Sequence, residues 1–372
     1  MNPSEPASAN PLPTGLVRYL PELEPELQQF LGEAFPKRDP QLRMARWKWM
    51  FLESARRLGV PPMVWLFRKP QGIIAHQGAL TVSLQVAGAR YTTGWFVETF
   101  VLEKFRKGPI GTGVIEKARL DLPFNLSLGQ TEQMRSIQLR TGWKQIADLQ
   151  TLMLVLNPSQ VFQGKFGNPL VRLAAVAAMN ASRRIRRWRG RPRGNDPAIR
   201  HLDEFGAAHD QLWNEVSPRY QTTVVRDAAY LNWKYVTQPG QDFTRLELTR
   251  NGKVCGLAIL KFVEPAGSYA YRRCFLVDFV VDPTRDDDVR WIFEATWQEA
   301  RNRNFDAVFL YLIHSRLQQL AESYGFLRRD PSRYLLIAAD GVPEAVQRAA
   351  LDAQTWFVTQ GDSDIDRPAS SD

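Results

Sequence analysis

The sequence predicts an α/β protein built from two similar domains in tandem. The chain has 372 residues, which is about the length of two common domains, and its 44% hydrophobic and 23% charged residues are typical of a globular protein. Runs with strand character alternate with segments of helical spacing. Short sequence matches also recur in one order at nearly one offset, which indicates a duplicated domain of about 150–170 residues.

The first half begins with residues 1–15, which are rich in Pro, Ser and Asn and are expected to be disordered. Helical spacing follows over 24–57 and again over 112–119. Between these helices lie three runs with strand character: Met63–Phe67, Ala79–Val86 and Trp95–Leu102. This half is therefore expected to form one α/β domain over residues 16–160.

Between the two halves, the cluster of Asn, Pro and Gly over 157–169 predicts a loop. An amphipathic helix over 170–188 is expected next, and the linker over 161–197 consists of this basic helix and the arginine-rich segment that follows it. One stripe of this helix would carry six apolar residues: Leu170, Leu173, Ala177, Ala181, Ile185 and Trp188. A new helix from residue 198 would open the second domain, 198–345, and 346–372 would be a tail docked through its aromatic residues.

The repeat consists of four matches between the halves. Each match is short, but all four keep the same order. The matched pairs are Trp47-Lys48-Trp49 with Trp233-Lys234-Tyr235, Gly72–Ala75 with Gly252–Cys255, Val97–Val101 with Val277–Val281, and Gly142-Trp143 with Gly325-Phe326. The aromatic residues of the first pair are interpreted as core residues, and the lysine between them is expected to reach the surface.

A glycine-rich loop connects the strand that ends at Leu102 to the helix that begins near Thr112. Unpaired N–H groups and the helix dipole make such a turn a binding site for pyrophosphate. The candidate phosphate-binding residues are Arg106, Lys107, Gly108, Ile110, Gly111, Thr112 and Gly113. The alternative is a plain strand-to-helix turn with two basic residues, and the loop by itself does not decide between them.

This order of elements resembles the GNAT (GCN5-related N-acetyltransferase) superfamily. Arg106 and Gly111 match the ends of its Gln/Arg-x-x-Gly-x-Gly/Ala loop, while Pro109 replaces the inner glycine and removes one N–H donor. Gly142-Trp143 is similar to the Gly-Phe turn of the family. The run from Arg226 to Pro239 resembles the opening of GNAT-like domains from bacterial envelope-polysaccharide loci.

The resemblance implies two GNAT-like domains, each a mixed, mainly antiparallel sheet flanked by helices, with acetyl-CoA bound in the first. It implies Glu98 as the general base, and the backbone N–H of Val101 or Leu102 as the group that polarises the thioester carbonyl. The alternative for Glu98 is a strand-end carboxylate paired with an arginine. At the place of the family's acidic tyrosine the chain has Gln138, which cannot donate a proton to the leaving thiolate.

The second half departs further from the family pattern. The corresponding loop, Val281–Asp288, has no glycine and contains four aspartates, whose charge would repel a phosphate. The second domain is therefore not expected to bind CoA there. One working and one degenerate cofactor loop in tandem resembles Fem-type aminoacyl transferases and other double GNAT proteins.

The leading functional hypothesis is acyl-CoA-dependent N-acyl transfer, with acetyl as the acyl group. The acceptor would be an amine such as an amino sugar in envelope polysaccharide assembly. One alternative is a Fem-type, aminoacyl-tRNA-dependent transferase, and another is a GNAT-like binding protein without catalysis. No metal site is expected, because the four histidines are far apart and the two cysteines lack zinc-ligand spacing.

A cluster of seven arginines accounts for most of the formal net charge of +9. Its members are Arg183, Arg184, Arg186, Arg187, Arg189, Arg191 and Arg193. Three partners remain open: an anionic membrane surface, nucleic acid, or none, if the segment is a solvated connector. The N-terminus lacks the pattern of a secretion signal, so the expected location is the cytoplasm, with peripheral contact at the inner membrane face.

Overall fold

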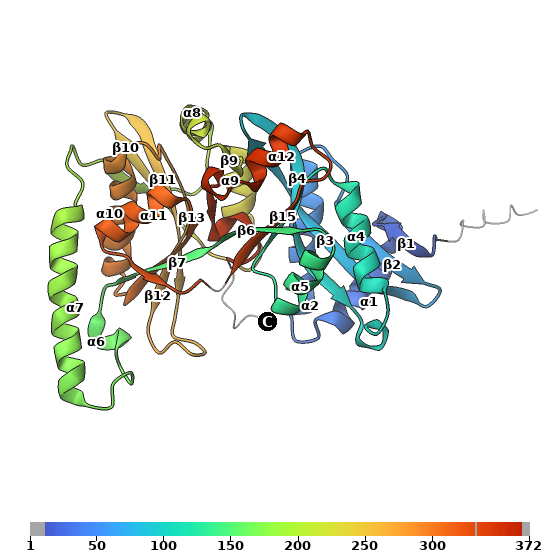
Figure 1. The fold of residues 1–372 in the computed structure, drawn as a ribbon, viewed down its shortest axis with the longest axis horizontal. Helices are drawn as coiled ribbons and strands as arrows, with labels where there is room; N and C mark the ends of the chain where they lie inside the picture. Colours follow the sequence, from blue (N-terminus) through green and yellow to red (C-terminus); the bar gives the residue numbers. More distant parts are fainter. Residues whose placement is uncertain (1–11, 332, 367–372) are drawn as a thin grey trace, which may run out of the picture.

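The computed structural model describes residues 12–331 and 333–366, and it consists of two mixed sheets, each flanked by helices (Figure 1). The first sheet has the strand order β1-β2-β3-β4-β5-β15-β6, with β9 paired to β3. Only β4 and β5 run parallel; the other neighbours are antiparallel. The strands are β1 (Gly15–Arg18), β2 (Val64–Lys69), β3 (Gly72–Val86), β4 (Ala89–Val101), β5 (Asn125–Leu128), β6 (Lys144–Asp148), β9 (Thr222–Val224) and β15 (Tyr334–Ala338).

The second sheet has the order β14-β7-β13-β12-β11-β10-β8, with β16 paired to β13. Again a single pair of neighbours, β12 and β13, runs parallel. The strands are β7 (Gln150–Val155), β8 (Ala198–His201), β10 (Thr244–Arg250), β11 (Lys253–Val263), β12 (Arg273–Val281), β13 (Ala307–Ile313), β14 (Leu327–Arg329) and β16 (Val358–Thr359). The expected architecture, two GNAT-like sheets in tandem, is therefore present.

The two halves exchange strands. β7 belongs to the first half of the sequence but pairs with β13 and β14 in the second sheet. β15 belongs to the second half but pairs with β5 and β6 in the first sheet. The ranges 16–160 and 198–345 that the sequence suggests are each continuous, whereas the second sheet contains β7 from the first half and the first sheet contains β9 and β15 from the second.

Helices cover both faces of the first sheet. α1 packs with the core cluster that contains Ile74 and Leu80 of β3, and α4 packs with a separate cluster that contains Ala75 and Ala79 of the same strand. The helices of the first half are α1 (Glu24–Ala34), α2 (Pro40–Trp47), η2 (Lys48–Glu53), α3 (Ser54–Arg57), α4 (Ile110–Asp121) and α5 (Glu132–Arg140), with the short turns η1 (Pro21–Leu23) and η3 (Glu103–Phe105).

In the second half, α10 packs against β11, β12 and β13, and α8 packs against β11 and β12. None of the described helices has the length and apolar character of a membrane span. The helices after β7 are α6 (Pro158–Val161), α7 (Pro169–Gly190), α8 (Ala207–Val216), η4 (Ser217–Arg219), α9 (Ala228–Tyr235), α10 (Asp286–Asn302), α11 (Ser315–Tyr324), α12 (Glu344–Leu351), η5 (Ala353–Thr355) and η6 (Gln360–Asp362).

Most of the expected elements are present, with two corrections. The segment from residue 198 begins with the strand β8, which pairs with β10, and the helix α8 starts only at Ala207. The expected loop over 157–169 contains the short helix α6. Of residues 1–15, expected to be disordered, 1–11 lie outside the described residues, and Gly15 begins β1.

The Trp-Lys-aromatic repeats meet where the two halves contact each other. Trp49 and Trp233 stack with ring centroids 4.8 Å apart and an interplanar angle of 17°. Each indole N–H donates to the other residue's carbonyl oxygen, at 2.9 Å and 3.1 Å. The aromatic residues are core residues, as expected. Lys48 reaches the surface, as expected, but Lys234 is fully buried.

The Trp49–Trp233 contact predicts strong energetic coupling between the halves. Truncating either residue to Ala should lower the free energy of unfolding by about 3–5 kcal/mol. In a double-mutant cycle measured by denaturant unfolding, the double variant should lose about 1–3 kcal/mol less than the sum of the two single losses, because each truncation already removes the shared contact. Pairing Trp49→Ala with Trp291→Ala on α10 is the control, and additivity at Trp49 and Trp233 would contradict the prediction.

Candidate functional site

The first sheet opens between its two parallel strands. β4 and β5 pair at a single position, Trp95 with Leu126, and then separate. A cavity of about 460 Å³ lies beside the separated ends. Its lining comes from β4, β5, the turn before α5, α5 itself, and three segments distant in sequence: Phe35, Arg38, Phe96, Val97, Glu98, Thr99, Ser127, Leu128, Gly129, Gln130, Thr131, Met134, Gln138, Arg333, Asp364 and Ile365.

A bulge in β4 places Glu98 at this cavity. The register between β3 and β4 shifts at this point, and the backbone of Glu98 has φ +51°, in the left-handed region. His76 stabilises the bulge: its Nε2 accepts from the indole N–H of Trp47 at 3.1 Å, so its Nδ1 carries the proton and donates to the Glu98 carbonyl at 2.8 Å. Burial lowers the pKa of His76 to about 4, so its ring is neutral near pH 7.

The Glu98 side chain forms an ion pair with Arg38. Arg38 Nη1 lies 2.7 Å from Glu98 Oε1, and the Glu98 side chain is only 7% exposed. This arginine pairing is one of the two roles that the sequence leaves open for Glu98. Because Glu98 also lines the cavity, the ion pair does not remove it from the site.

A second carboxylate reaches the cavity from the C-terminal segment. Asp364 is half-buried there, and burial raises its pKa; the positive charge of Arg46 opposes this rise, and the negative charge of Glu98 adds to it. The segment passes close to Gly129, where φ is +76° and a Cβ would lie 2.4 Å from Ile365 Cγ2. Sequence analysis missed Asp364, since its only signal was an acidic C-terminal stretch, interpreted as a tail.

Buried lysines fix the position of this segment. Lys234 Nζ donates to the Ser363 carbonyl at 2.6 Å and lies 3.2 Å from Asp366 Oδ2. Lys261 Nζ donates to the Asp366 carbonyl at 2.8 Å. Residues of α9 and β11, in the second half, thus hold a carboxylate of the second half against the cavity of the first sheet.

Ser127 and Gln138 form a polar contact on the cavity wall. Gln138 Nε2 lies 3.0 Å from Ser127 Oγ, and both side chains are buried. Gln138, which the resemblance aligns with the family's tyrosine, thus lines the cavity. Ser127 is a hydroxyl at the same wall, which sequence analysis did not single out.

The glycine-rich loop lies beyond the end of β4 and does not line the cavity. The Leu102 N–H donates to the Ile74 carbonyl in β3 at 3.0 Å. Because successive N–H groups of a strand point to opposite edges, the Val101 N–H points toward the side where β5 has separated. Arg106 Nε donates to the Val101 carbonyl on that side at 2.9 Å. Between the two sequence candidates for carbonyl polarisation, the geometry favours Val101.

The helix α4 begins at Ile110 after Pro109, and no side chain caps its first turn. Gly111 lies close to β4, since a Cβ there would be 3.2 Å from Val101 Cγ2. Gly108 and Gly113 have open space around them, and the side chains of Lys107 and Thr112 are exposed. The first turn therefore presents unpaired N–H groups to solvent next to the end of β4.

In the second sheet the corresponding opening is filled by the chain itself. β12 and β13 pair over four positions, and β16 then pairs with the end of β13. The segment η6 follows and packs against β12 and β13. Gly361 is required there, because a Cβ would lie 2.0 Å from the Tyr235 hydroxyl.

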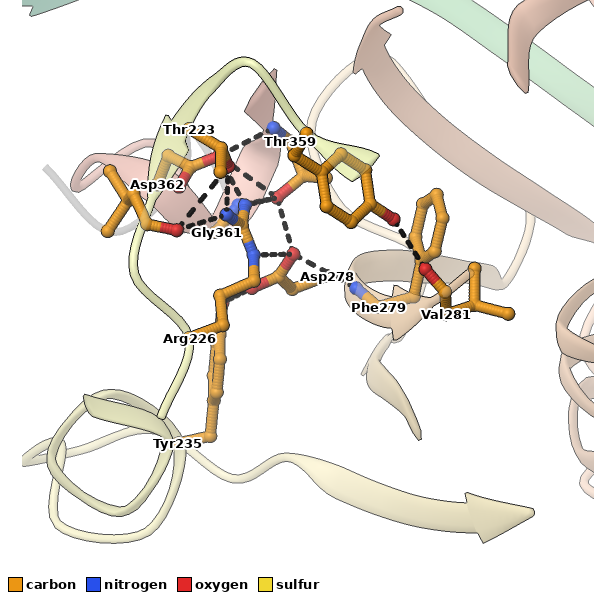
Figure 2. A network of polar contacts seen from close by, with 11 residues as sticks. Thr223, Arg226, Tyr235, Asp278, Phe279, Val281, Thr359, Gly361 and Asp362 are labelled. Atoms are coloured by element: carbon orange, nitrogen blue, oxygen red, sulfur yellow. Dashed lines mark hydrogen bonds and ion pairs between the residues drawn. The ribbon is translucent and has the colours of Figure 1, made fainter. Parts of the chain in front are cut away.

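A buried ionic network joins this segment to β12 (Figure 2). Arg226 Nε lies 3.0 Å from Asp278 Oδ1, Arg226 Nη2 lies 2.7 Å from Asp362 Oδ2, and all three side chains are fully buried. The Tyr235 hydroxyl donates to Asp278 at 2.8 Å, as does the Thr359 hydroxyl at 2.9 Å. Asp278 occupies the place in β12 that Glu98 has in β4. Its carboxylate, however, is taken up by the buried ion pair and hydrogen bonds of the network.

Comparisons with known proteins find relatives by structure alone. No protein-family model matches the chain, and no curated protein matches its sequence. A GCN5-related N-acetyltransferase from Anabaena variabilis aligns with TM-score 0.58 and 12% identity over 87% of this chain and 72% of that one. A probable N-acyltransferase of unknown function from Enterococcus faecalis aligns with TM-score 0.60 and 10% identity over 88% and 73%.

The N-myristoyltransferase of Saccharomyces cerevisiae, solved with bound myristoyl-CoA, is also similar. It aligns with TM-score 0.53 and 12% identity over 90% of this chain and 85% of that one. At such identities the comparisons define the fold alone. The chain has the tandem GNAT-like arrangement of two mixed, mainly antiparallel sheets.

The network in Figure 2 predicts a large loss of stability when its cation is removed. Arg226→Met would leave Asp278 and Asp362 buried without a counter-charge, so the free energy of unfolding should fall by about 3–5 kcal/mol. Arg348→Met, which breaks an exposed pair with Glu344, should cost less than about 1 kcal/mol. Equal losses for the two variants in denaturant unfolding would contradict this assignment.

Proposed function

We propose that the chain is an acyl-CoA-dependent N-acyltransferase whose reaction takes place in the cavity between β4 and β5. One observation carries this proposal: two parallel strands separate beside a bulge, and two carboxylates, Glu98 and Asp364, face the resulting cavity. The similarity to acyltransferase folds, including one solved with bound myristoyl-CoA, supports the choice of an acyl-CoA.

The donor would lie across the separated strands. Its thioester carbonyl would accept from the Val101 N–H, which points to that side. Its pyrophosphate would bind at the first turn of α4, where unpaired N–H groups and the positive end of the helix dipole face solvent, with Arg106 and Lys107 adding charge. Pro109 supplies no N–H, so the binding groups are those of Ile110, Gly111 and Thr112.

The acceptor amine would enter the polar side of the cavity. A carboxylate takes a proton from the amine, the nitrogen attacks the thioester carbon, and the C–S bond breaks to release the CoA thiolate. Glu98 and Asp364 are the two candidate bases. Glu98 is already paired with Arg38, whereas burial raises the pKa of Asp364 toward the range of a useful base.

For the acceptor substrate, the cavity supports a chemical class rather than one compound. The charged lining, with Arg38, Glu98, Arg333 and Asp364, suits a hydrophilic amine. The acetyl group and an amino-sugar acceptor in envelope polysaccharide assembly come from the sequence resemblance. Comparing activity with acetyl-CoA and longer acyl-CoAs tests the acyl group, and a series of amino sugars tests the acceptor.

If the donor binds at the first turn of α4, it should raise the unfolding temperature, and one added negative charge at that turn should abolish this rise. Acetyl-CoA at one hundred times its Kd should stabilise the wild type by about 2.7 kcal/mol. Gly113→Asp should remove the shift, because its carboxylate would repel the pyrophosphate, while an acidic residue in the first turn favours the helix. Gly113→Ala is the matched control and should keep the shift, since the position has open space.

If neither acetyl-CoA nor a longer acyl-CoA shifts the unfolding temperature of the folded wild type, the acyltransferase proposal is wrong. The Gln138 position would then favour a GNAT-like binding protein without catalysis. A shift that survives Gly113→Asp would place the donor elsewhere on the chain.

The pH dependence of acyl transfer separates the two candidate bases. If Asp364 is the base, the rate should rise with pH through its raised pKa, and Asp364→Asn should lower kcat by about 10²–10⁴-fold. Glu98→Gln would then keep substantial activity and move the acidic limb to lower pH, because it removes a negative charge that raises the pKa of Asp364. Glu103→Gln, exposed on η3, is the control. Full activity of Asp364→Asn with loss in Glu98→Gln would assign the base to Glu98.

A further inference from the structure

The long helix α7 turns its apolar stripe away from the protein. Its large apolar side chains at Leu170, Leu173, Ile185 and Trp188 are 73%, 64%, 52% and 79% exposed, and the alanines between them are exposed as well. In Figure 1 the helix lies along the outer edge of the second half, beyond α10 and α11. A continuous exposed stripe of this kind marks a contact surface.

Specific contacts on the inner side fix this orientation. Arg187 Nη2 lies 2.5 Å from Glu294 Oε1 of α10, and the guanidinium carbon of Arg187 lies 3.4 Å from the ring centroid of Trp297. At Gly190, a Cβ would be only 2.6 Å from the Cα of Tyr324, so the end of α7 touches α11 closely. The helix is held by its arginine-bearing side, and its apolar side is left outward.

Positive charge without acidic partners surrounds the stripe. Within the described chain, the side chains of four exposed arginines form no ion pair: Arg184, Arg186, Arg189 and Arg191. A cavity of about 660 Å³ between α7 and α10 is lined by five arginines, Trp188, Trp297 and a single carboxylate, Asp306, which accepts hydrogen bonds from Asn157 and the Arg272 N–H. The pKa of Arg183 is lowered by burial and by the neighbouring charges of Arg301, Arg184 and Arg187, which shows how crowded the positive charge is.

We propose that α7 lies flat on an anionic lipid bilayer, with its apolar stripe at the acyl-chain boundary and its arginines on lipid phosphates. From Leu170 to Trp188 the stripe runs about 27 Å along the helix. At 100° per residue, Arg184 and Arg189 fall on opposite borders of the stripe, where long basic side chains reach the headgroups. The cavity beside Trp188 would receive a headgroup phosphate.

The exposed apolar stripe and the arginines beside it together favour a membrane over other partners. Nucleic acid would neutralise the arginines but would leave the exposed leucines, isoleucine and tryptophan uncovered. A second copy of the chain through the same face would bring two unneutralised arginine clusters together. An anionic bilayer is complementary to both the charge and the apolar stripe.

The test measures binding of the full chain to phosphatidylcholine vesicles with and without about 30% phosphatidylglycerol, by co-sedimentation and by tryptophan fluorescence. We expect binding at least about thirtyfold tighter to the anionic vesicles, with a blue shift from Trp188. Arg184→Gln with Arg189→Gln should weaken binding about thirtyfold, since each basic residue contributes about fivefold. Leu173→Asp with Ile185→Asp should abolish binding.

Controls separate this proposal from its rivals. Leu120→Asp, an equally exposed apolar position on α4, should leave vesicle binding unchanged. All the changed side chains are exposed, and equal unfolding temperatures confirm that the variants fold. Absence of binding to anionic vesicles overturns the proposal, as does binding that survives Leu173→Asp with Ile185→Asp. Response to inorganic phosphate alone, salt-dependent RNA binding without vesicle binding, or self-association lost in the aspartate variant would each assign the surface to another partner.

Discussion

The exchange of β7 and β15 is the constraint on which the rest of the structure depends. Because each sheet is completed by a strand from the other half, neither half contains all the backbone partners that its sheet requires. The reciprocal hydrogen bonds of Trp49 and Trp233 then fix the two halves at their contact. The same joining lets the C-terminal segment close one cleft and enter the other.

The two sheets have equivalent openings that differ in what fills them. Both lie beside a bulge in the strand before the parallel neighbour, and both have a carboxylate at that bulge, Glu98 in one and Asp278 in the other. In the second sheet, η6 fills the opening, and Arg226 neutralises the buried carboxylates of Asp278 and Asp362. In the first, the opening remains, and the segment contributes Asp364 to its wall. The two halves thus provide one open cavity and one filled opening, and the segment that fills the second opening continues into the wall of the first.

The sequence predicted the architecture well because periodicity and the four repeated matches are local signals. The strands around Val97 and Val277 and the turns at Gly142 and Gly325 occupy equivalent places. The strand exchange could not be predicted, because the apolar sequences of β7 and β15 fit a buried strand in either sheet. The site was predicted only in part: Glu98 lines the cavity, but Asp364 reaches it through long-range contacts with Lys234 and Lys261. Lys234 looked like a surface lysine because its partners lie more than 120 positions away.

The strand exchange also sets an order of events during synthesis. β5 leaves the ribosome about 200 residues before its partner β15, a delay of about 10–40 s at ordinary elongation rates. For that time one edge of β5 has no β15 to pair with, and an unpaired edge invites pairing with another chain. The cavity of the first sheet is therefore complete only after Asp364 has been synthesised, so a chain that stops before Asp364 would lack part of the proposed site rather than merely be shorter.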